Sequence, residues 1–230
     1  MRIATWNVNS LKARFDKVAW WLERGRPDVG DDEPFAEARM LSAVCGGIRV
    51  VCLYAPNGRI VGSSFYQAKL QWFERLERWL AEAADPGEPI VLGGDLNVAP
   101  QDIDVWDARA CHGGTHVSPP EREAFARLCR WGLVDAYRLH HPEPGRYTWW
   151  DYRAGNFHKN FGMRIDHLLV SRALRPRAVW AEIDREARKG KPLPSDHAPL
   201  VVDIDGPGCP FDAGWASAEE RIAARRARPG

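Results

Sequence analysis

The sequence carries no excess charge of either sign and no paired cysteine motif. Its 32 Lys and Arg residues nearly balance its 31 Asp and Glu residues, so the formal net charge is +1. This balance gives no global attraction to a polyanion, although a local basic patch can still bind one. The five cysteines are scattered without a CxxC pair, which argues against a disulfide framework and a zinc site. We therefore expect a reducing, cytoplasmic location.

Long apolar runs are missing as well. The first residues contain no apolar stretch of the kind found in signal peptides, and no segment has the length needed to span a membrane. With 230 residues, 45% of them hydrophobic, the chain can bury a sizeable core. We find no internal repeat and no interior linker. Residues 1–206 are predicted to form one domain, and residues 207–230 a tail that is helical or disordered.

Apolar patterns separated by turn residues predict an α/β (α+β) fold, and 20 Gly and 17 Pro residues indicate many loops. Helices are expected over 16–24, 64–84 and 121–131. Strands are expected over 2–6, 39–44, 48–53, 90–92, 165–170, 178–183 and 200–204. The apolar stripe of the longest helix consists of Tyr66, Leu70, Phe73, Leu76 and Leu80. Gly46 and Gly47 lie between the second and third strands, which predicts a hairpin.

Polar side chains gather where these short strands begin or end. They are Asn7, Asp95, Asn97, Asp166, Asp196 and His197. Strand ends bring residues that are distant in sequence to one rim of a sheet, and loops on a rigid scaffold carry catalytic groups. Carboxylates and carboxamides are oxygen ligands that suit Mg²⁺, which usually accompanies a phosphate. Such a site can hydrolyse a phosphodiester by polarising its phosphoryl oxygens.

Each of these pieces has a plain structural explanation when it is taken alone. The segment 93–95 can be an ordinary strand exit, and the segment 195–197 can be a hydrogen-bonded loop motif. Asp196 beside His197 also resembles a hydrolase pair, but no Ser stands in a G-x-S-x-G setting, which argues against a serine hydrolase. The remaining histidines show no metal-ligand spacing.

Taken together, the segments resemble the exodeoxyribonuclease III family of the endonuclease/exonuclease/phosphatase superfamily. The matching stretches follow the family's order: IATWNVNSLKAR, LYAPNGR, VLGGDLNVAP, YTWWDYRAG, NFGMRIDHLLVS and PSDHAPL. The resemblance implies a DNase I-like, four-layer α/β/β/α sandwich with the active site at one end of its two sheets. It also implies a monomeric, Mg²⁺-dependent hydrolase, with Mn²⁺ as a second option. Its substrate would be double-stranded DNA, cut 5′ to abasic sites and trimmed from 3′ ends in base-excision repair.

The resemblance further implies roles for individual residues. Asn7 and Asp196 would be metal ligands, with Asp95, Asn97 and His197 beside them. Asp95 would orient or deprotonate the attacking water, and Asn97 would help hold that water and the phosphate.

Other residues would bind or position the substrate. Tyr54 would hydrogen-bond a phosphate oxygen, and Asp166 would orient His197 so that its imidazole stabilises the phosphate or exchanges a proton with it. The expected walls of a pocket for a base-less sugar are Trp149, Met163 and Ile165. The expected contacts to backbone phosphates are Lys12, Arg14 and Arg164.

One part of the family's pattern has no counterpart. The family carries, after its first helix and a Pro-Asp pair, a strand that ends in Gln-Glu, and that Glu is a principal metal ligand. Here Pro27 and Asp28 are followed at once by an acidic loop. Its acidic residues, Asp31, Asp32 and Glu33, do not stand at a strand end. Loss of a carboxylate weakens binding of the cation, and loss of a strand leaves backbone groups to be paired otherwise.

Two alternatives to an active DNA phosphodiesterase therefore stay open. The first is a catalytically impaired relative that binds DNA ends or abasic sites without turnover. The second is another phosphodiesterase of the same superfamily, acting on a phosphoinositide or on sphingomyelin.

Overall fold

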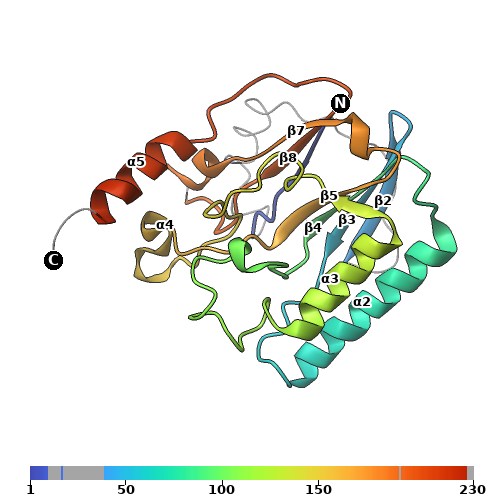
Figure 1. Ribbon diagram of the computed structural model, residues 1–230, viewed down its shortest axis with the longest axis horizontal. Coiled ribbons are helices and arrows are strands. Elements are labelled where there is room, and N and C mark those ends of the chain that lie inside the picture. The colour runs from blue at the N-terminus through green and yellow to red at the C-terminus, as the bar shows by residue number, and fades with distance from the viewer. Residues whose placement is uncertain (10–16, 18–38, 192, 227–230) are drawn as a thin grey trace.

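The computed structural model describes residues 1–9, 17, 39–191 and 193–226 (Figure 1). Several predictions fall on other residues. Apart from Lys17, the expected helix over 16–24 lies outside the described residues, and so do Lys12, Arg14 and the acidic loop with Asp31, Asp32 and Glu33.

The described strands form two sheets. The first has the order β1-β8-β7 and is antiparallel: β1 (Arg2–Thr5), β8 (Leu200–Ile204) and β7 (Ala178–Ile183). The second has the order β2-β3-β4-β6-β5: β2 (Met40–Cys45), β3 (Ile48–Tyr54), β4 (Ile90–Asp95), β6 (Asp166–Ser171) and β5 (Leu133–Asp135). In the second sheet only the β3–β4 pairing is parallel.

Alternation along the central strands divides the apolar side chains between two cores. Val91 and Val170 face the first sheet and share a core with its residues Leu200 and Val202. Leu92, on the opposite face of β4, belongs to the core beneath the outer helices. The two sheets therefore pack face to face.

Helices α2 (Ser64–Ala83) and α3 (Pro119–Trp131) lie side by side on the outer face of the second sheet (Figure 1). Across the first sheet, Val201 packs against Ala187 of the 3-10 helix η4 (Arg185–Arg188) and against Phe211. The predicted four-layer α/β/β/α sandwich is confirmed.

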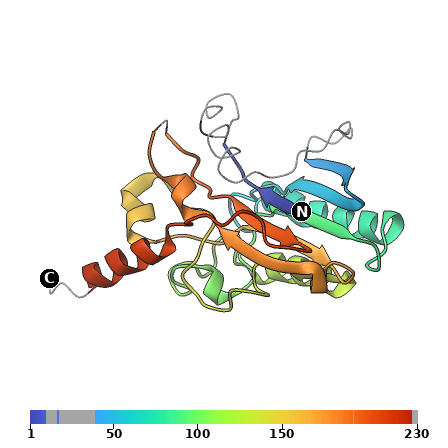
Figure 2. The ribbon, with the colours of Figure 1, turned by 90° about the horizontal axis from the view of Figure 1, so that it is seen from above.

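Shorter elements complete the described chain. They are the 3-10 helices η1 (Asp102–Asp104), η2 (Arg153–Gly155) and η3 (Arg175–Arg177), and helices α4 (Asn156–Lys159) and α5 (Trp215–Arg226). The tail is thus helical over α5, at the far end of the molecule in Figure 2. Trp215 is buried in the main core, where its indole N–H donates to the carbonyl of Ile183 at 2.7 Å. No helix within the described ranges combines the length and apolar character needed to cross a membrane.

Five elements differ from the prediction in the ways described next. Strand β4 continues beyond residue 92 to Asp95, because Gly93 and Gly94 remain in the sheet. Helix α3 begins at Pro119, since proline at a first helical position loses no hydrogen bond. Strand β5 and helix α4 were not predicted; both are too short to show a periodic pattern. In α2, Leu70 was predicted to be buried, but Lys69 is buried instead. The buried face of the helix is therefore rotated toward Lys69.

The register of three neighbouring strands positions the polar rim. Tyr54 of β3 pairs with Asp95 of β4, and Asp95 pairs with Asp166 of β6. This register needs glycine at position 94, which has φ of 151°. A Cβ atom there would lie 1.8 Å from the carbonyl oxygen of Leu53, far inside contact distance. Gly94 therefore lets β3 approach β4 closely enough to align the three side chains.

A buried ion pair joins α2 to α3 beneath this rim. Lys69 and Glu121 both have fully buried side chains and form a salt bridge. The Lys69 ammonium also donates to the carbonyl of Asn97 at 2.6 Å. Glu121 accepts from the Ser118 hydroxyl at 2.6 Å and from the backbone N–H of His116 at 3.0 Å. The pair is well satisfied, so removal of one partner leaves a buried charge.

Lys69→Met is expected to lower the free energy of unfolding by about 3 to 5 kcal/mol, because the Glu121 carboxylate loses its buried counter-charge. Urea denaturation followed by circular dichroism measures this change. The matched control is Arg78→Met, an exposed position on the same helix, which should change stability by no more than about 0.5 kcal/mol. The double variant Lys69→Met/Glu121→Gln should recover part of the loss, because the amide oxygen still accepts from Ser118 and His116 and leaves no unpaired charge. A loss below about 1 kcal/mol for Lys69→Met would contradict the assigned role.

Candidate active site

A pocket of about 450 Å³ opens where β1, β3 and β4 end and where β6 and β8 begin. Its lining residues are Asn7, Asn9, Tyr54, Asn57, Asp95, Asn97, His116, Trp149, Ile165, Asp196 and His197. Most of the polar residues that the sequence predicts to share a rim thus lie around one cavity.

Asp95 lines the pocket and is 5% exposed. Its Oδ1 accepts the backbone N–H of Asn97 at 2.9 Å, and its Oδ2 accepts the amide of Asn7 at 3.0 Å. Burial, followed by the negative charge of Asp166, raises the pKa of Asp95 to about 6. The pocket therefore holds an aspartate that is more basic than usual and whose two oxygens are held in place by hydrogen bonds.

His197 and Asp166 form a buried pair beside Asp95. The imidazole Nδ1 lies 2.8 Å from Asp166 Oδ2, and Nε2 lies 4.0 Å from Asp95 Oδ2. A carboxylate only accepts hydrogen bonds, so Nδ1 donates and Nε2 is directed toward the pocket. Burial acts to lower the pKa of His197, but the Asp166 carboxylate outweighs it and raises that pKa to about 9. The ring is thus an imidazolium at neutral pH.

Asp196 connects the pocket wall to the segment after β1. Its Oδ2 accepts the indole N–H of Trp149 at 3.0 Å, and its Oδ1 accepts the amide of Asn9 at 3.2 Å. The neighbouring Ser195 hydroxyl donates to the carbonyl of Asn7 at 2.6 Å. These contacts join residues 7–9, after β1, to residues 195–196, before β8.

Asn97 is held from several sides in a left-handed conformation, with φ of 53°. Its side-chain oxygen accepts from Asn57 at 3.1 Å, and its side-chain amide donates to the carbonyl of Ala55 at 3.1 Å. Its own carbonyl oxygen lies 2.6 Å from both the Lys69 ammonium and His116 Nδ1. Burial, and then the charge of Lys69, lower the pKa of His116 to about 4, so this wall of the pocket carries a neutral imidazole.

The donor set fits a divalent cation. Oxygens of Asp95 and Asp166 and a ring nitrogen of His197 lie within 4.8 Å of one another. The two carboxylates offer the ligand atoms, since a protonated imidazole donates hydrogen bonds and has no free lone pair. Asp166 Oδ1 is buried and has no hydrogen-bond partner within the part of the chain that the structure describes. Two buried carboxylates that repel each other, one with an unused oxygen, match the preference of hard divalent cations for oxygen ligands.

Two predicted substrate contacts lie away from the pocket lining. Met163 packs behind Trp149, with which it forms a β-bridge, so it supports the wall rather than lining it. The predicted phosphate contact at Arg164 is wrong. Its side chain is 1% exposed, and its guanidinium lies 2.7 Å from both Asp104 Oδ1 and Asp135 Oδ2. The two carboxylates neutralise the positive charge of this buried guanidinium, and no phosphate can reach it.

Four residues at or beneath the pocket were not singled out from the sequence: Asn9, Asn57, Lys69 and His116. Asn57 stands within the quoted stretch LYAPNGR and could have been selected there. Ser118 and Glu121 have capping-box spacing, which marks the start of α3 but not the Lys69 pair. His116 follows no motif, and only the folded chain brings it to the site.

Comparisons with known proteins agree with this geometry. Residues 4–197 match the model of the Endonuclease/Exonuclease/phosphatase family. The chain is 35% identical over 178 residues to an exodeoxyribonuclease of Bacillus subtilis, covering 77% of this chain and 68% of the relative. It is 32% identical over 195 residues to exodeoxyribonuclease III of Haemophilus influenzae, covering 80% of this chain and 72% of the relative.

Two solved structures share the fold. One is an AP endonuclease from Archaeoglobus fulgidus, with a TM-score of 0.83 and 31% identity. The other is a 3′ phosphatase from Neisseria bound to a product DNA hairpin, with a TM-score of 0.82 and 30% identity. Each match covers 90% of this chain and 100% of the solved one. The chain therefore belongs to the endonuclease/exonuclease/phosphatase family, within the group of exodeoxyribonuclease III.

Proposed function

We propose that the protein is a Mg²⁺-dependent DNA phosphodiesterase that cuts 5′ to abasic sites and removes nucleotides from 3′ ends. The observation that carries this proposal is a buried cluster in which Asp95 and His197 line the pocket and Asp166 lies directly beneath them. It combines a carboxylate for water, an imidazolium for the phosphate and oxygen ligands for a cation. Family membership makes the chain a hydrolase of phosphodiester bonds in DNA repair.

The relatives support DNA as the substrate. One structural neighbour is an AP endonuclease, and another was solved with a product DNA hairpin. We also propose that this protein acts as a monomer, as the family resemblance implies. All five cysteines are free, which suits the reducing conditions of the cytoplasm.

Asp95 is the residue placed to act on the attacking water. Asn7 and Asn97 fix its two oxygens, so its free lone pairs point into the pocket. Asn97 is itself held by Asn57, which keeps its side chain in one position for water and phosphate. A positioned base contributes roughly 10²- to 10⁴-fold to such reactions.

His197 is placed to meet the negative charge of the phosphate. Asp166 holds the imidazolium and directs Nε2 toward the pocket, where it can stabilise an oxyanion or deliver a proton. Tyr54, whose side chain is 46% exposed, stands at the rim within reach of a phosphate oxygen. Trp149 and Ile165 form the wall for a base-less sugar, supported from behind by Met163.

The carboxylates of Asp95 and Asp166 would hold the cation, with Asn7 and Asp196 joining them as the family resemblance implies. A bound Mg²⁺, or Mn²⁺ in its place, would polarise the phosphoryl oxygens and stabilise the leaving oxygen. No described residue supplies the Glu that the family carries after its first helix. We therefore propose weaker metal binding than in relatives that keep this carboxylate.

Asp95→Asn is expected to reduce nicking of a duplex that carries one abasic analogue by roughly 10²-fold or more, because an amide cannot accept the proton of water. Wild-type protein should nick this duplex with Mg²⁺ and not with EDTA, as resolved on a denaturing gel. The control is Asp205→Asn, whose carboxylate pairs with Arg177 at the surface. Nicking that survives Asp95→Asn unchanged would rule out the mechanism.

Asp166→Asn is expected to lower kcat by about 10²-fold or more while KM changes little, since His197 loses the charge that keeps it protonated and oriented. Steady-state rates at saturating Mg²⁺ separate this effect from weaker metal binding. Equal kcat values for the variant and the wild type would show that the pair is structural.

The missing Glu favours one other candidate function, a relative that binds DNA without turnover. That protein would shift an abasic duplex in a native gel, with binding that weakens steeply as salt rises. It would release no product over hours in Mg²⁺ or Mn²⁺. Product formation that requires Asp95 decides against this candidate.

A further inference from the structure

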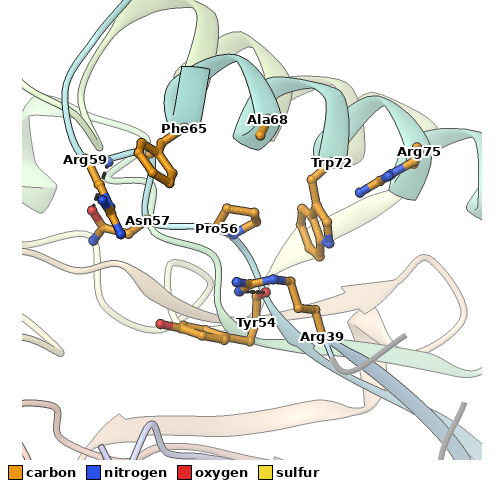
Figure 3. Close-up of a pocket in the computed structure, with 10 residues that line it drawn as sticks. Arg39, Tyr54, Pro56, Asn57, Arg59, Phe65, Ala68, Trp72 and Arg75 are labelled. Atoms are coloured by element: carbon orange, nitrogen blue, oxygen red, sulfur yellow. Dashed lines mark hydrogen bonds between the residues drawn. The ribbon is translucent and has the colours of Figure 1, made fainter. Parts of the chain in front are cut away.

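A second cavity of about 590 Å³ lies beside the catalytic pocket, between the start of α2 and the end of β3 (Figure 3). Phe65 and Trp72 project into it from α2, and Tyr54 faces them from β3. Its volume is that of a site for one small ligand.

The charged residues that are described around this cavity have one sign. Arg39, Arg59 and Arg75 line it, and none of its lining residues within 39–191 is an Asp or Glu. Arg39 and Arg59 lie on different sides of the opening in Figure 3, so the positive potential spans the cavity. In a protein with a net charge of +1 this is a local concentration of charge, and it selects an anionic ligand.

Two of the arginines are paired with exposed aromatic rings. The guanidinium carbon of Arg59 lies 3.7 Å from the ring centroid of Phe65, whose side chain is 49% exposed. The guanidinium carbon of Arg39 lies 5.0 Å from the ring centroid of Tyr54. Exposed aromatic faces next to arginines bind single-stranded nucleic acid, since each base stacks on a ring while the phosphates meet the cations.

The cavity adjoins the catalytic pocket. Tyr54 and Asn57 line both of them, and Asn57 donates to Asn97 on the catalytic side at 3.1 Å. A DNA strand whose scissile phosphate lies above Asp95 therefore brings its adjoining nucleotide to the opening of the second cavity.

We propose that this cavity binds an unpaired nucleotide next to the scissile phosphate, with its base stacked on Phe65 and its phosphate held by Arg39 and Arg59. The inference rests on the proposed function and adds a substrate class, DNA whose strand is frayed or single-stranded beside the cleavage point. A base that remains paired cannot stack on Phe65, so a fully paired end lacks this contact.

The test is the affinity for a short fluorescent oligothymidylate, measured by anisotropy in EDTA so that hydrolysis plays no part. Phe65→Leu keeps an apolar side chain but removes the ring, and it should raise Kd about tenfold, while Phe65→Tyr should restore wild-type binding. Arg59→Gln should also weaken binding and should reduce the dependence of Kd on salt. The control is Arg78→Gln, an exposed position of α2 outside the cavity, which should leave Kd within about twofold.

A blunt, fully paired duplex of equal length serves as the second ligand, and Phe65→Leu should change its Kd by less than about twofold. Unchanged affinity of Phe65→Leu and Arg59→Gln for the oligothymidylate would overturn the proposal, and so would an equal loss for both DNA forms. Because binding is measured without turnover, an inactive protein that still shows the selective loss would refute the proposed function and keep this site.

Discussion

The close approach of β3 to β4 is the constraint on which the site depends. Only glycine at position 94 allows it, and the resulting register places Tyr54, Asp95 and Asp166 in one row across three strands. Every other pocket residue is arranged around this row by loops. Rigid sheet geometry therefore decides where the reactive atoms lie, and the loops add recognition.

Buried charges form two layers beneath the pocket. The upper layer sets Asp95 and Asp166 against the imidazolium of His197, and a divalent cation would compensate the remaining negative charge. The lower layer is the Lys69–Glu121 pair, which holds the backbone of Asn97 from below. Each of these charged side chains has a hydrogen-bond partner, so their positions are fixed before substrate binds. Arg164 belongs to a third such group with Asp104 and Asp135.

Much of this arrangement could be predicted from the sequence. Apolar patterns separated by turn residues located seven of the described strands, and motif order indicated which strand ends meet. The failures have physical causes. Arg164 lies next to pocket residues in the sequence, but in the strand-like segment leading into β6 neighbouring side chains point to opposite faces, so its side chain points away from the rim. The burial of Lys69 was not predicted, because the apolar stripe used to assign the buried face of a helix does not include lysine. His116 itself has a φ of 76° and reaches the pocket from a loop. Hydrophobic periodicity does not reveal the position of such a residue.

The pairing of β1 with β8 has a consequence for synthesis of the chain. Ile3 pairs with Val202, and the amino group of Met1 donates to the carbonyl of Ile204 at 2.7 Å. The second sheet, by contrast, is complete once β6 has emerged from the ribosome. The first strand must therefore wait, unpaired with β8, until residues 200–204 have been translated. The half of the pocket formed by Asn7, Asp196 and His197 is thus assembled last, so a truncated nascent chain carries no finished nuclease site.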